Sequence, residues 1–311
     1  MGSRYEIGRR GLVLGLARAA AVGAVAGPAM AVERAAAPET FSVRSSDGTI
    51  LAGDAQGDPQ APEILFIHGL RQSRLSWDKP FADPALAGFR LVRFDLRGHG
   101  DSDKPASPEA YRDADRWADD VAAMIAGARL RRPVLVGWSL GGYVIGAYLR
   151  SRGGGQIAGI NLVDAVTKLS PDLLTPLAGT FARTTSSHDL AERTAATADF
   201  LSACFHRPPT GIEWQRMLVI NGMTARAVNE GITSTGTTDL EPAFQAFAGP
   251  ILLTHGVHDR LVRVAMSERI KALHPRSHLS LYAGSGHTPF HEEPARYGRE
   301  LAAFAATAIK G

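Results

Sequence analysis

Short apolar runs recur along this chain and alternate with segments of helical periodicity. The runs that predict strands are residues 63–67, 134–136, 160–163, 251–254 and 279–282. Residues 279–282 alternate between apolar and polar, whereas the continuous apolar runs indicate strands that are buried on both faces. Residues 114–128 place Trp117, Val121, Met124 and Ile125 on one helical face, and residues 295–309 have the same amphipathic character. This alternation predicts an α/β protein whose parallel sheet is covered by helices on both faces.

Two segments depart from the alternation. Residues 41–55 predict two opening strands around the turn at Ser46-Asp47-Gly48. Residues 168–246 contain short helical patterns punctuated by prolines, with no clear strand, and we interpret them as a cap inserted after the sixth strand. Its larger apolar side chains either line an acyl pocket or form the cap's own small core; they are Phe200, Phe205, Trp214, Met217 and Leu218.

The run at 134–136 leads into Gly137-Trp138-Ser139-Leu140-Gly141, which is followed by a helix-like segment over 142–150. A serine between two glycines at a strand-to-helix turn is exposed on a sharp bend that bulkier residues would obstruct. A serine hydroxyl is a weak nucleophile unless a base activates it and an oxyanion site receives the negative charge. The pattern therefore predicts Ser139 as a nucleophile, whereas the plainer interpretation is a tight turn that contains a serine.

The partners of such a serine are expected downstream, at the ends of later strands. Asp259 follows the run at 251–254, and His287 lies 28 residues further on, in the glycine-rich segment after residues 279–282. We expect His287 to act as general base and then general acid, and Asp259 to orient its imidazole. Asp164, which ends the run at 160–163, is the competing candidate for the acid.

The oxyanion donors are predicted from position. The strand at 63–67 ends in His68-Gly69-Leu70, and the backbone N–H groups of Leu70 and Leu140 are the expected donors. His68 is expected to hold this loop in place. Trp138 and Trp77 are candidates for contact with substrate, and packing is the alternative for both.

These motifs together resemble the α/β-hydrolase fold serine hydrolases, in the branch of esterases and cofactor-free haloperoxidases. The resemblance rests on His68-Gly69, the loop Arg97-Gly98-His99-Gly100-Asp101-Ser102, the turn around Ser139, Asp259, His287 and Glu293-Pro294. It implies a mostly parallel eight-stranded sheet flanked by helices, with a helical cap after strand six. It also implies that the loop at 97–102 braces the serine turn. Related enzymes that cleave haloalkanes or epoxides carry aspartate at the nucleophile position, which Ser139 argues against.

The function we expect is hydrolysis of a small or medium ester-like substrate (ester, lactone or thioester) through an acyl-enzyme, without a cofactor. One alternative is cofactor-free perhydrolysis by the same triad, and another is a ligand sensor that retains the triad. No cluster of His, Cys, Asp or Glu has metal-ligand spacing, and the single cysteine, Cys204, cannot form an internal disulfide. No pattern in the sequence predicts an oligomeric state.

The N-terminal segment has a different composition. Arg9-Arg10 precede an apolar stretch that leads to Ala29-Met30-Ala31, which resembles a twin-arginine export signal over residues 1–31. We therefore expect a hydrolase domain over 32–311 and an exported, periplasmic or secreted, protein; an unprocessed tail on a cytoplasmic enzyme is the alternative. No run of eighteen apolar residues occurs, so we expect no membrane-spanning helix.

Charge indicates the same division of the chain. Residues 1–31 contain four arginines and one glutamate, a net charge of +3, which equals the formal net charge of the whole 311-residue chain. The remainder is therefore neutral overall, which argues against a nucleic-acid-binding surface.

Overall fold

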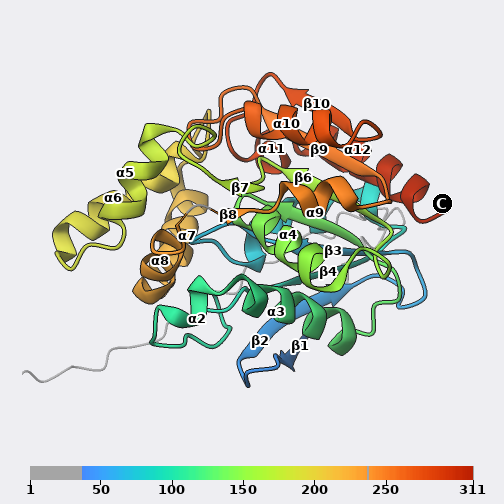
Figure 1. Ribbon diagram of the computed structural model, residues 1–311, viewed down its shortest axis with the longest axis horizontal. Coiled ribbons are helices and arrows are strands. Elements are labelled where there is room, and N and C mark those ends of the chain that lie inside the picture. Colours follow the sequence, from blue (N-terminus) through green and yellow to red (C-terminus); the bar gives the residue numbers. More distant parts are fainter. Residues whose placement is uncertain (1–36, 237, 311) are drawn as a thin grey trace, which may run out of the picture. The chain divides into compact units, whose positions relative to one another are not determined.

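An eight-stranded sheet forms the centre of the protein (Figure 1). The computed structural model describes residues 37–236 and 238–310, so the predicted leader over 1–31 lies outside the described residues. In spatial order the strands are β1 (Glu39–Arg44), β2 (Ile50–Gln56), β4 (Arg90–Phe94), β3 (Glu63–Ile67), β5 (Val134–Trp138), β6 (Gly159–Val163), β9 (Ile251–Gly256) and β10 (His278–Tyr282). The β1–β2 and β2–β4 pairs are antiparallel and every other pair is parallel. The predicted sheet is confirmed.

The central strands β3, β5, β6 and β9 are buried on both sides because both faces of the sheet are covered there. In β3, Leu65 and Ile67 pack into one hydrophobic cluster, whereas Ile64 and Phe66 pack into the other. Successive side chains of a strand point to opposite faces, so a strand covered on both sides has no polar alternation.

The helices fall into two layers. One face of the sheet is covered by α3 (Ala114–Gly127), α4 (Leu140–Arg152), α9 (Glu241–Ala246) and α10 (Ala265–Leu273). The other is covered by η1 (Arg74–Trp77), α1 (Asp78–Phe81), η2 (Pro84–Leu86), α11 (Pro289–Glu292) and α12 (Pro294–Ala308). The short α2 (Glu109–Arg112) precedes α3 and packs against α8. In α3, Trp117, Val121, Met124 and Ile125 are buried together, as the periodicity predicts.

A helical cap follows β6. It consists of α5 (Pro176–Thr184), α6 (Leu190–Ala203), α7 (Gly211–Gly222) and α8 (Arg226–Thr233), which lie to one side of the sheet in Figure 1. The two-residue strands β7 (Lys168–Leu169) and β8 (Thr238–Asp239) pair at its base. Two residues are too few to leave a period-two pattern, so the sequence does not predict this pairing.

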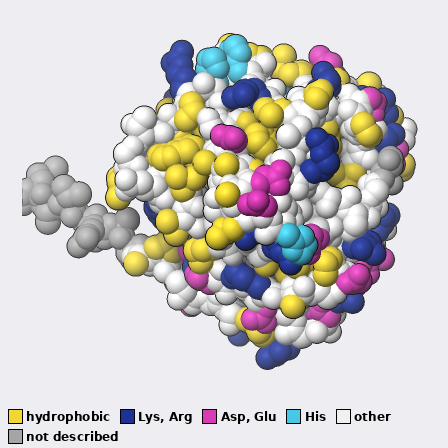
Figure 2. Space-filling model, turned by 90° about the vertical axis from the view of Figure 1, so that its left-hand side faces the viewer, with side chains coloured by type: hydrophobic (Ala, Val, Ile, Leu, Met, Phe, Trp, Pro, Cys, Tyr) yellow, Lys and Arg dark blue, Asp and Glu magenta, His cyan; other side chains and the backbone are white. Residues whose placement is uncertain are grey.

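The cap has its own apolar core and also an apolar surface. Phe205 is buried in that core, and Trp214, Met217 and Leu218 pack against it. Hydrophobic side chains also gather on the face that carries α5 and α6 (Figure 2). Across the residues that the structure describes, no helix has the length and hydropathy to cross a bilayer.

Candidate active site

The predicted site residues lie at the carboxyl ends of neighbouring parallel strands. Leu70 follows β3, Ser139 follows β5, Asp164 follows β6, Asp259 follows β9 and His287 follows β10. These five strands are consecutive in the sheet. Because parallel strands end at the same edge, segments far apart in the sequence meet there.

Ser139 occupies a strained turn between β5 and α4. Its backbone has φ 52° and ψ −115°, a conformation that non-glycine residues rarely adopt. A Cβ on Gly137 would lie 2.7 Å from the carbonyl oxygen of Gly141, so the turn closes only with glycine there. Ser139 is partly exposed, whereas Trp138 and Leu140 on either side are buried. The turn thus presents one hydroxyl from an otherwise buried segment.

His287 is hydrogen-bonded to a buried carboxylate. Its Nδ1 atom lies 2.7 Å from Oδ2 of Asp259, and the two side chains are 2% and 1% exposed. Oδ1 of Asp259 accepts the backbone N–H groups of Leu261 (2.7 Å) and Val262 (3.0 Å). Burial by itself would raise the pKa of Asp259, but the charge and hydrogen bond of His287 and the hydrogen bond from Val262 lower it. Asp259 is therefore held as a carboxylate against the imidazole.

Two further contacts fix His287 from its backbone. The indole Nε1 of Trp138 donates to the carbonyl oxygen of His287 at 2.6 Å, and the His287 N–H donates to the carbonyl oxygen of Cys204 at 3.0 Å. The first contact ties His287 to the residue that precedes Ser139. The second ties it to the end of the cap helix α6.

Asp164 lies behind this pair. Its Oδ1 accepts the backbone N–H of Gly256 at 2.9 Å, and Oδ2 is buried with no hydrogen-bond partner among the described residues. Burial, together with the nearby negative charge of Asp259, raises the pKa of Asp164 well above its ordinary value. Asp259, rather than Asp164, is the carboxylate that contacts His287.

Asp164, His255 and Asp259 are also the one group of described residues whose ligand atoms could meet at a metal ion. These atoms lie within 4.8 Å of one another. An ion there would compete with His287 for Oδ2 of Asp259, and Nε2 of His255, the ring nitrogen that faces both carboxylates, already lies 3.2 Å from the carbonyl oxygen of Val262. The arrangement suits one ionised carboxylate, Asp259, beside one protonated carboxyl, Asp164, better than it suits metal binding.

The two predicted oxyanion donors lie beside Ser139. Leu70 and Leu140 line the same cavity as Ser139, and a Cβ added to Gly69 would come within 3.1 Å of the serine Cβ. Leu140 is the first residue of α4, so its N–H has no partner within the helix. Among the described residues, neither N–H donates a backbone hydrogen bond in a turn, loop or helix cap.

Two buried histidines hold residues 68–71, the predicted oxyanion loop. His68 accepts the backbone N–H of Leu96 at Nε2 (3.0 Å) and contacts the carbonyl oxygen of Gly69 through Nδ1 (2.7 Å). His99 accepts the backbone N–H of Arg71 at Nε2 (3.1 Å) and contacts the carbonyl oxygen of Arg97 through Nδ1 (2.9 Å). Burial lowers the pKa of His68 to about 4 and that of His99 to about 3, so both rings are neutral near pH 7. The sequence predicts this role for His68 but not for His99, although His99 belongs to the loop at 97–102 that was expected to brace the serine turn.

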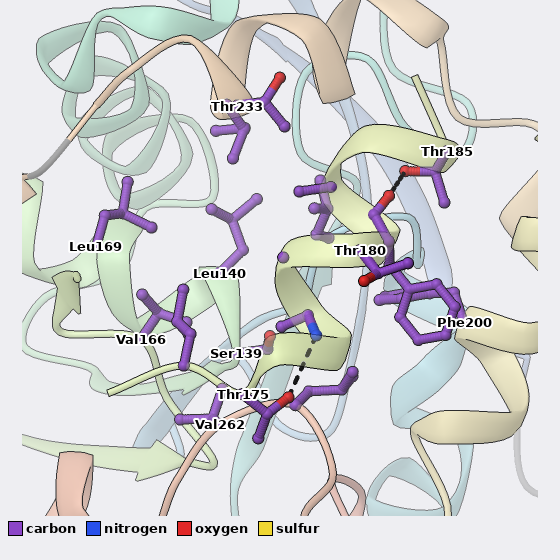
Figure 3. Close-up of a pocket in the computed structure, with 18 of the residues that line it drawn as sticks. Ser139, Leu140, Val166, Leu169, Thr175, Thr180, Thr185, Phe200, Thr233 and Val262 are labelled. Carbon is purple, nitrogen blue, oxygen red and sulfur yellow. Dashed lines mark hydrogen bonds between the residues drawn. The ribbon is translucent and has the colours of Figure 1, made fainter. Parts of the chain in front are cut away.

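A cavity of about 810 Å³ opens beside Ser139 (Figure 3). Leu140, Val166 and Val262 lie near the serine, and Thr180 belongs to the wall formed by α5. The lining is mainly aliphatic side chains and threonines, which fits a largely apolar organic ligand.

Trp77 and Trp138, the two candidates for contact with substrate, pack in the core, which was the alternative for both. Trp77 is fully buried and Trp138 is 2% exposed, and both pack with Phe290 in the core under α12 rather than lining the cavity. Sequence position brought them close to the site, but the indole rings turn towards the core. Of the five apolar cap residues, only Phe200 lines the cavity. A further residue in its wall, Arg71, was missed, although it directly follows the predicted oxyanion donor Leu70.

Known proteins share this fold. Among solved structures, a candidate aryl esterase from Burkholderia cenocepacia has a TM-score of 0.83 and 40% sequence identity, covering 88% of this chain and 100% of its own. A non-heme haloperoxidase of Rhodococcus erythropolis is 31% identical over 260 residues, 79% of this chain and 92% of its own. A bifunctional esterase/perhydrolase of Acinetobacter calcoaceticus is 29% identical over 282 residues, 84% of this chain and 98% of its own. The family model for the α/β hydrolase fold matches residues 62–294, and this chain belongs to that family.

Proposed function

We propose that the protein is a serine esterase that cleaves small or medium esters, lactones or thioesters through an acyl-enzyme. One observation carries the proposal: a partly exposed serine on a strained turn lines an apolar cavity, and a histidine nearby is held by a buried aspartate. The similarity of this chain to an aryl esterase and to a bifunctional esterase/perhydrolase supports hydrolase activity on esters.

The proposed mechanism assigns one task to each group. The hydroxyl of Ser139 attacks the substrate carbonyl carbon while Nε2 of His287 takes its proton, and Asp259 stabilises the resulting imidazolium. The N–H groups of Leu70 and Leu140 donate to the negative oxygen of the tetrahedral intermediate. His287 then protonates the leaving alkoxide. In the second half, His287 takes a proton from the water that attacks the acyl-serine and returns it to the Ser139 oxygen as the acid product leaves.

The test is hydrolysis of p-nitrophenyl esters from acetyl to dodecanoyl by the wild type and Ser139→Ala. We expect Ser139→Ala to lower kcat by about 10⁴-fold or more while circular dichroism shows an unchanged fold. The preferred chain length would report the depth of the cavity under the cap. Equal turnover by a purified Ser139→Ala preparation would refute the assignment of Ser139.

Perhydrolysis is the second candidate, because two relatives carry haloperoxidase or perhydrolase names. In that reaction hydrogen peroxide replaces water as the attacker of the acyl-serine, and a peroxyacid leaves. Peroxyacid formation from acetate and hydrogen peroxide, measured with wild type and Ser139→Ala, distinguishes the two. Ester hydrolysis without peroxyacid formation would exclude perhydrolysis and support the esterase proposal.

We also propose that residues 1–31 direct export by the twin-arginine route. The proposal is supported by Arg9-Arg10, the apolar stretch after them and Ala29-Met30-Ala31. Cell fractionation of the wild type and of an Arg9→Lys/Arg10→Lys variant tests it. Equal amounts of the two proteins outside the cytoplasm would contradict it.

A further inference from the structure

Arg71 is a buried cation in the wall of the cavity that holds Ser139. The residue is 4% exposed and lines the cavity together with Leu70 and Ser139. Its backbone has φ 64°, and its N–H donates to His99, so the main chain is fixed where the side chain departs. The side chain extends from the oxyanion loop towards the cap.

The guanidinium of Arg71 has only neutral partners. Nε donates to Oδ1 of Asn221 at 3.3 Å, and Nη2 donates to Oγ1 of Thr197. The guanidinium carbon lies 5.8 Å from the centre of the Phe200 ring. Over the described part of the chain, no carboxylate lies within ion-pair distance of Arg71, and its Nη1 donates no hydrogen bond.

Two other buried arginines of the same protein are paired. Arg93 contacts Asp54 at 2.6 Å, and Arg97 contacts Asp120 at 2.6 Å. A buried charge without a counter-ion is strongly unfavourable, so proteins normally pair such groups. Arg71 therefore departs from the rule that the rest of this structure follows, and it does so at the cavity that holds the candidate nucleophile.

Among the residues described, the cavity lining around Arg71 contains no carboxylate, and unpaired donors lie beside it. The lining of the cavity includes a second arginine, Arg183, and no aspartate or glutamate. Asn221 is fully buried, and its Nδ2 has no acceptor among the described residues. Burial lowers the pKa of Arg71 only to about 10, so the guanidinium stays charged at neutral pH.

We propose that Arg71 binds a carboxylate carried by the substrate, so that the preferred substrate is an ester with a free carboxylate, such as a half-ester of a dicarboxylic acid. This inference rests on the proposed esterase function. The guanidinium fork can donate two parallel hydrogen bonds to a carboxylate, and the ion pair would be shielded from water. Leu70 would hold the oxyanion while the next residue, Arg71, holds the distal carboxylate of the same molecule.

Two matched substrate pairs test the proposal, one for each side of the ester bond. For the acyl side, mono-p-nitrophenyl glutarate is compared with p-nitrophenyl 5-methylhexanoate, in which an isopropyl group replaces the carboxylate. For the alcohol side, 4-acetoxybutanoate is compared with 4-methylpentyl acetate in a pH-stat. Ser139→Ala supplies the uncatalysed background for each. We expect the wild type to favour the charged ester in kcat/KM by about tenfold or more in at least one pair.

The decisive variant is Arg71→Met, which keeps an unbranched side chain at the same backbone conformation. It should lower the charged-to-neutral ratio of kcat/KM by about tenfold or more, and Arg71→Lys should retain part of the preference. Arg193→Met is the control, because Arg193 lies near Arg71 but outside the cavity lining. Its ratio should stay within about twofold of the wild type. No preference for either charged ester, or an equal loss for both members of a pair in Arg71→Met, would overturn the proposal.

A binding measurement separates this inference from the proposed function. Calorimetric titration of glutarate and of 4-hydroxybutanoate into the wild type and Arg71→Met needs no turnover. Binding that depends on Arg71 supports the carboxylate site even if no ester is hydrolysed. Failure of the wild type to bind either anion refutes the site even if neutral esters are cleaved.

Discussion

Oδ2 of Asp259 lies 2.7 Å from Nδ1 of His287, and the raised pKa of Asp164 leaves this contact to a single ionised carboxylate. Two buried carboxyl groups so close together cannot both ionise without a large cost, and the one with the better partners keeps the charge. Asp259 has His287 and two backbone N–H groups, whereas Oδ2 of Asp164 has no partner among the described residues. The proton therefore stays on Asp164.

This division of roles predicts unequal effects on catalysis. Asp259→Asn should lower kcat by about 10³- to 10⁴-fold, because an amide cannot stabilise the imidazolium of His287. Asp164→Asn should cost less than about tenfold, because the amide resembles the protonated acid already present. Steady-state kinetics with p-nitrophenyl butanoate compare the two variants. A larger loss in Asp164→Asn than in Asp259→Asn would reverse the assignment of the acid.

The raised pKa of Asp164 also predicts that Asp164→Asn gains stability relative to the wild type as pH rises. A carboxyl whose pKa is raised by folding binds its proton more tightly in the folded state, so the folded state loses stability from this group as pH rises above about 4. Asp164→Asn removes that loss. The free energy of unfolding of the variant, measured in urea, should exceed that of the wild type at pH 7 by more than it does at pH 4.5. A difference that stays constant with pH would contradict the protonated state of Asp164.

The buried histidines of the oxyanion loop predict sensitivity to acid. Folding lowers the pKa of His99 to about 3, so the unfolded chain binds a proton at His99 that the folded chain does not. Its contribution to stability is complete above about pH 6.5 and falls by about 1.4 kcal/mol per pH unit below that value. His99→Gln keeps an acceptor for the N–H of Arg71 but cannot be protonated. Between pH 5.5 and 4, its unfolding free energy should depend on pH less steeply than that of the wild type, and parallel curves would refute the prediction.

The strained turn at Ser139 predicts a trade-off between activity and stability. Glycine adopts positive φ without steric cost, so Ser139→Gly should be more stable than Ser139→Ala by about 1 kcal/mol. Both variants should be inactive, which makes alanine the matched control for lost contacts. Thermal unfolding of the two proteins checks the ranking. If alanine proves at least as stable as glycine, the serine turn is not strained in solution.

The sequence determined the sheet, its covering helices and the family, because each depends on local pattern. Strands buried on both faces read as short apolar runs, and the glycines at 137 and 141 reveal a sharp turn whatever surrounds it. The order of Ser139, Asp259 and His287 at strand ends was enough to predict the candidate site as well.

Which of these side chains meet depends on how distant segments pack against one another. Asp164 and Asp259 both follow strands. Which of the two contacts His287 depends on how β6, β9 and β10 lie side by side. Trp77 and Trp138 flank the site in sequence but turn into the core. In the sequence, Arg71 resembles an ordinary loop residue. In the structure it is buried against the cap, and no carboxylate of the described chain pairs with it. Pairing, side-chain direction and the burial of a charge arise from contacts between distant segments, which a local pattern does not record.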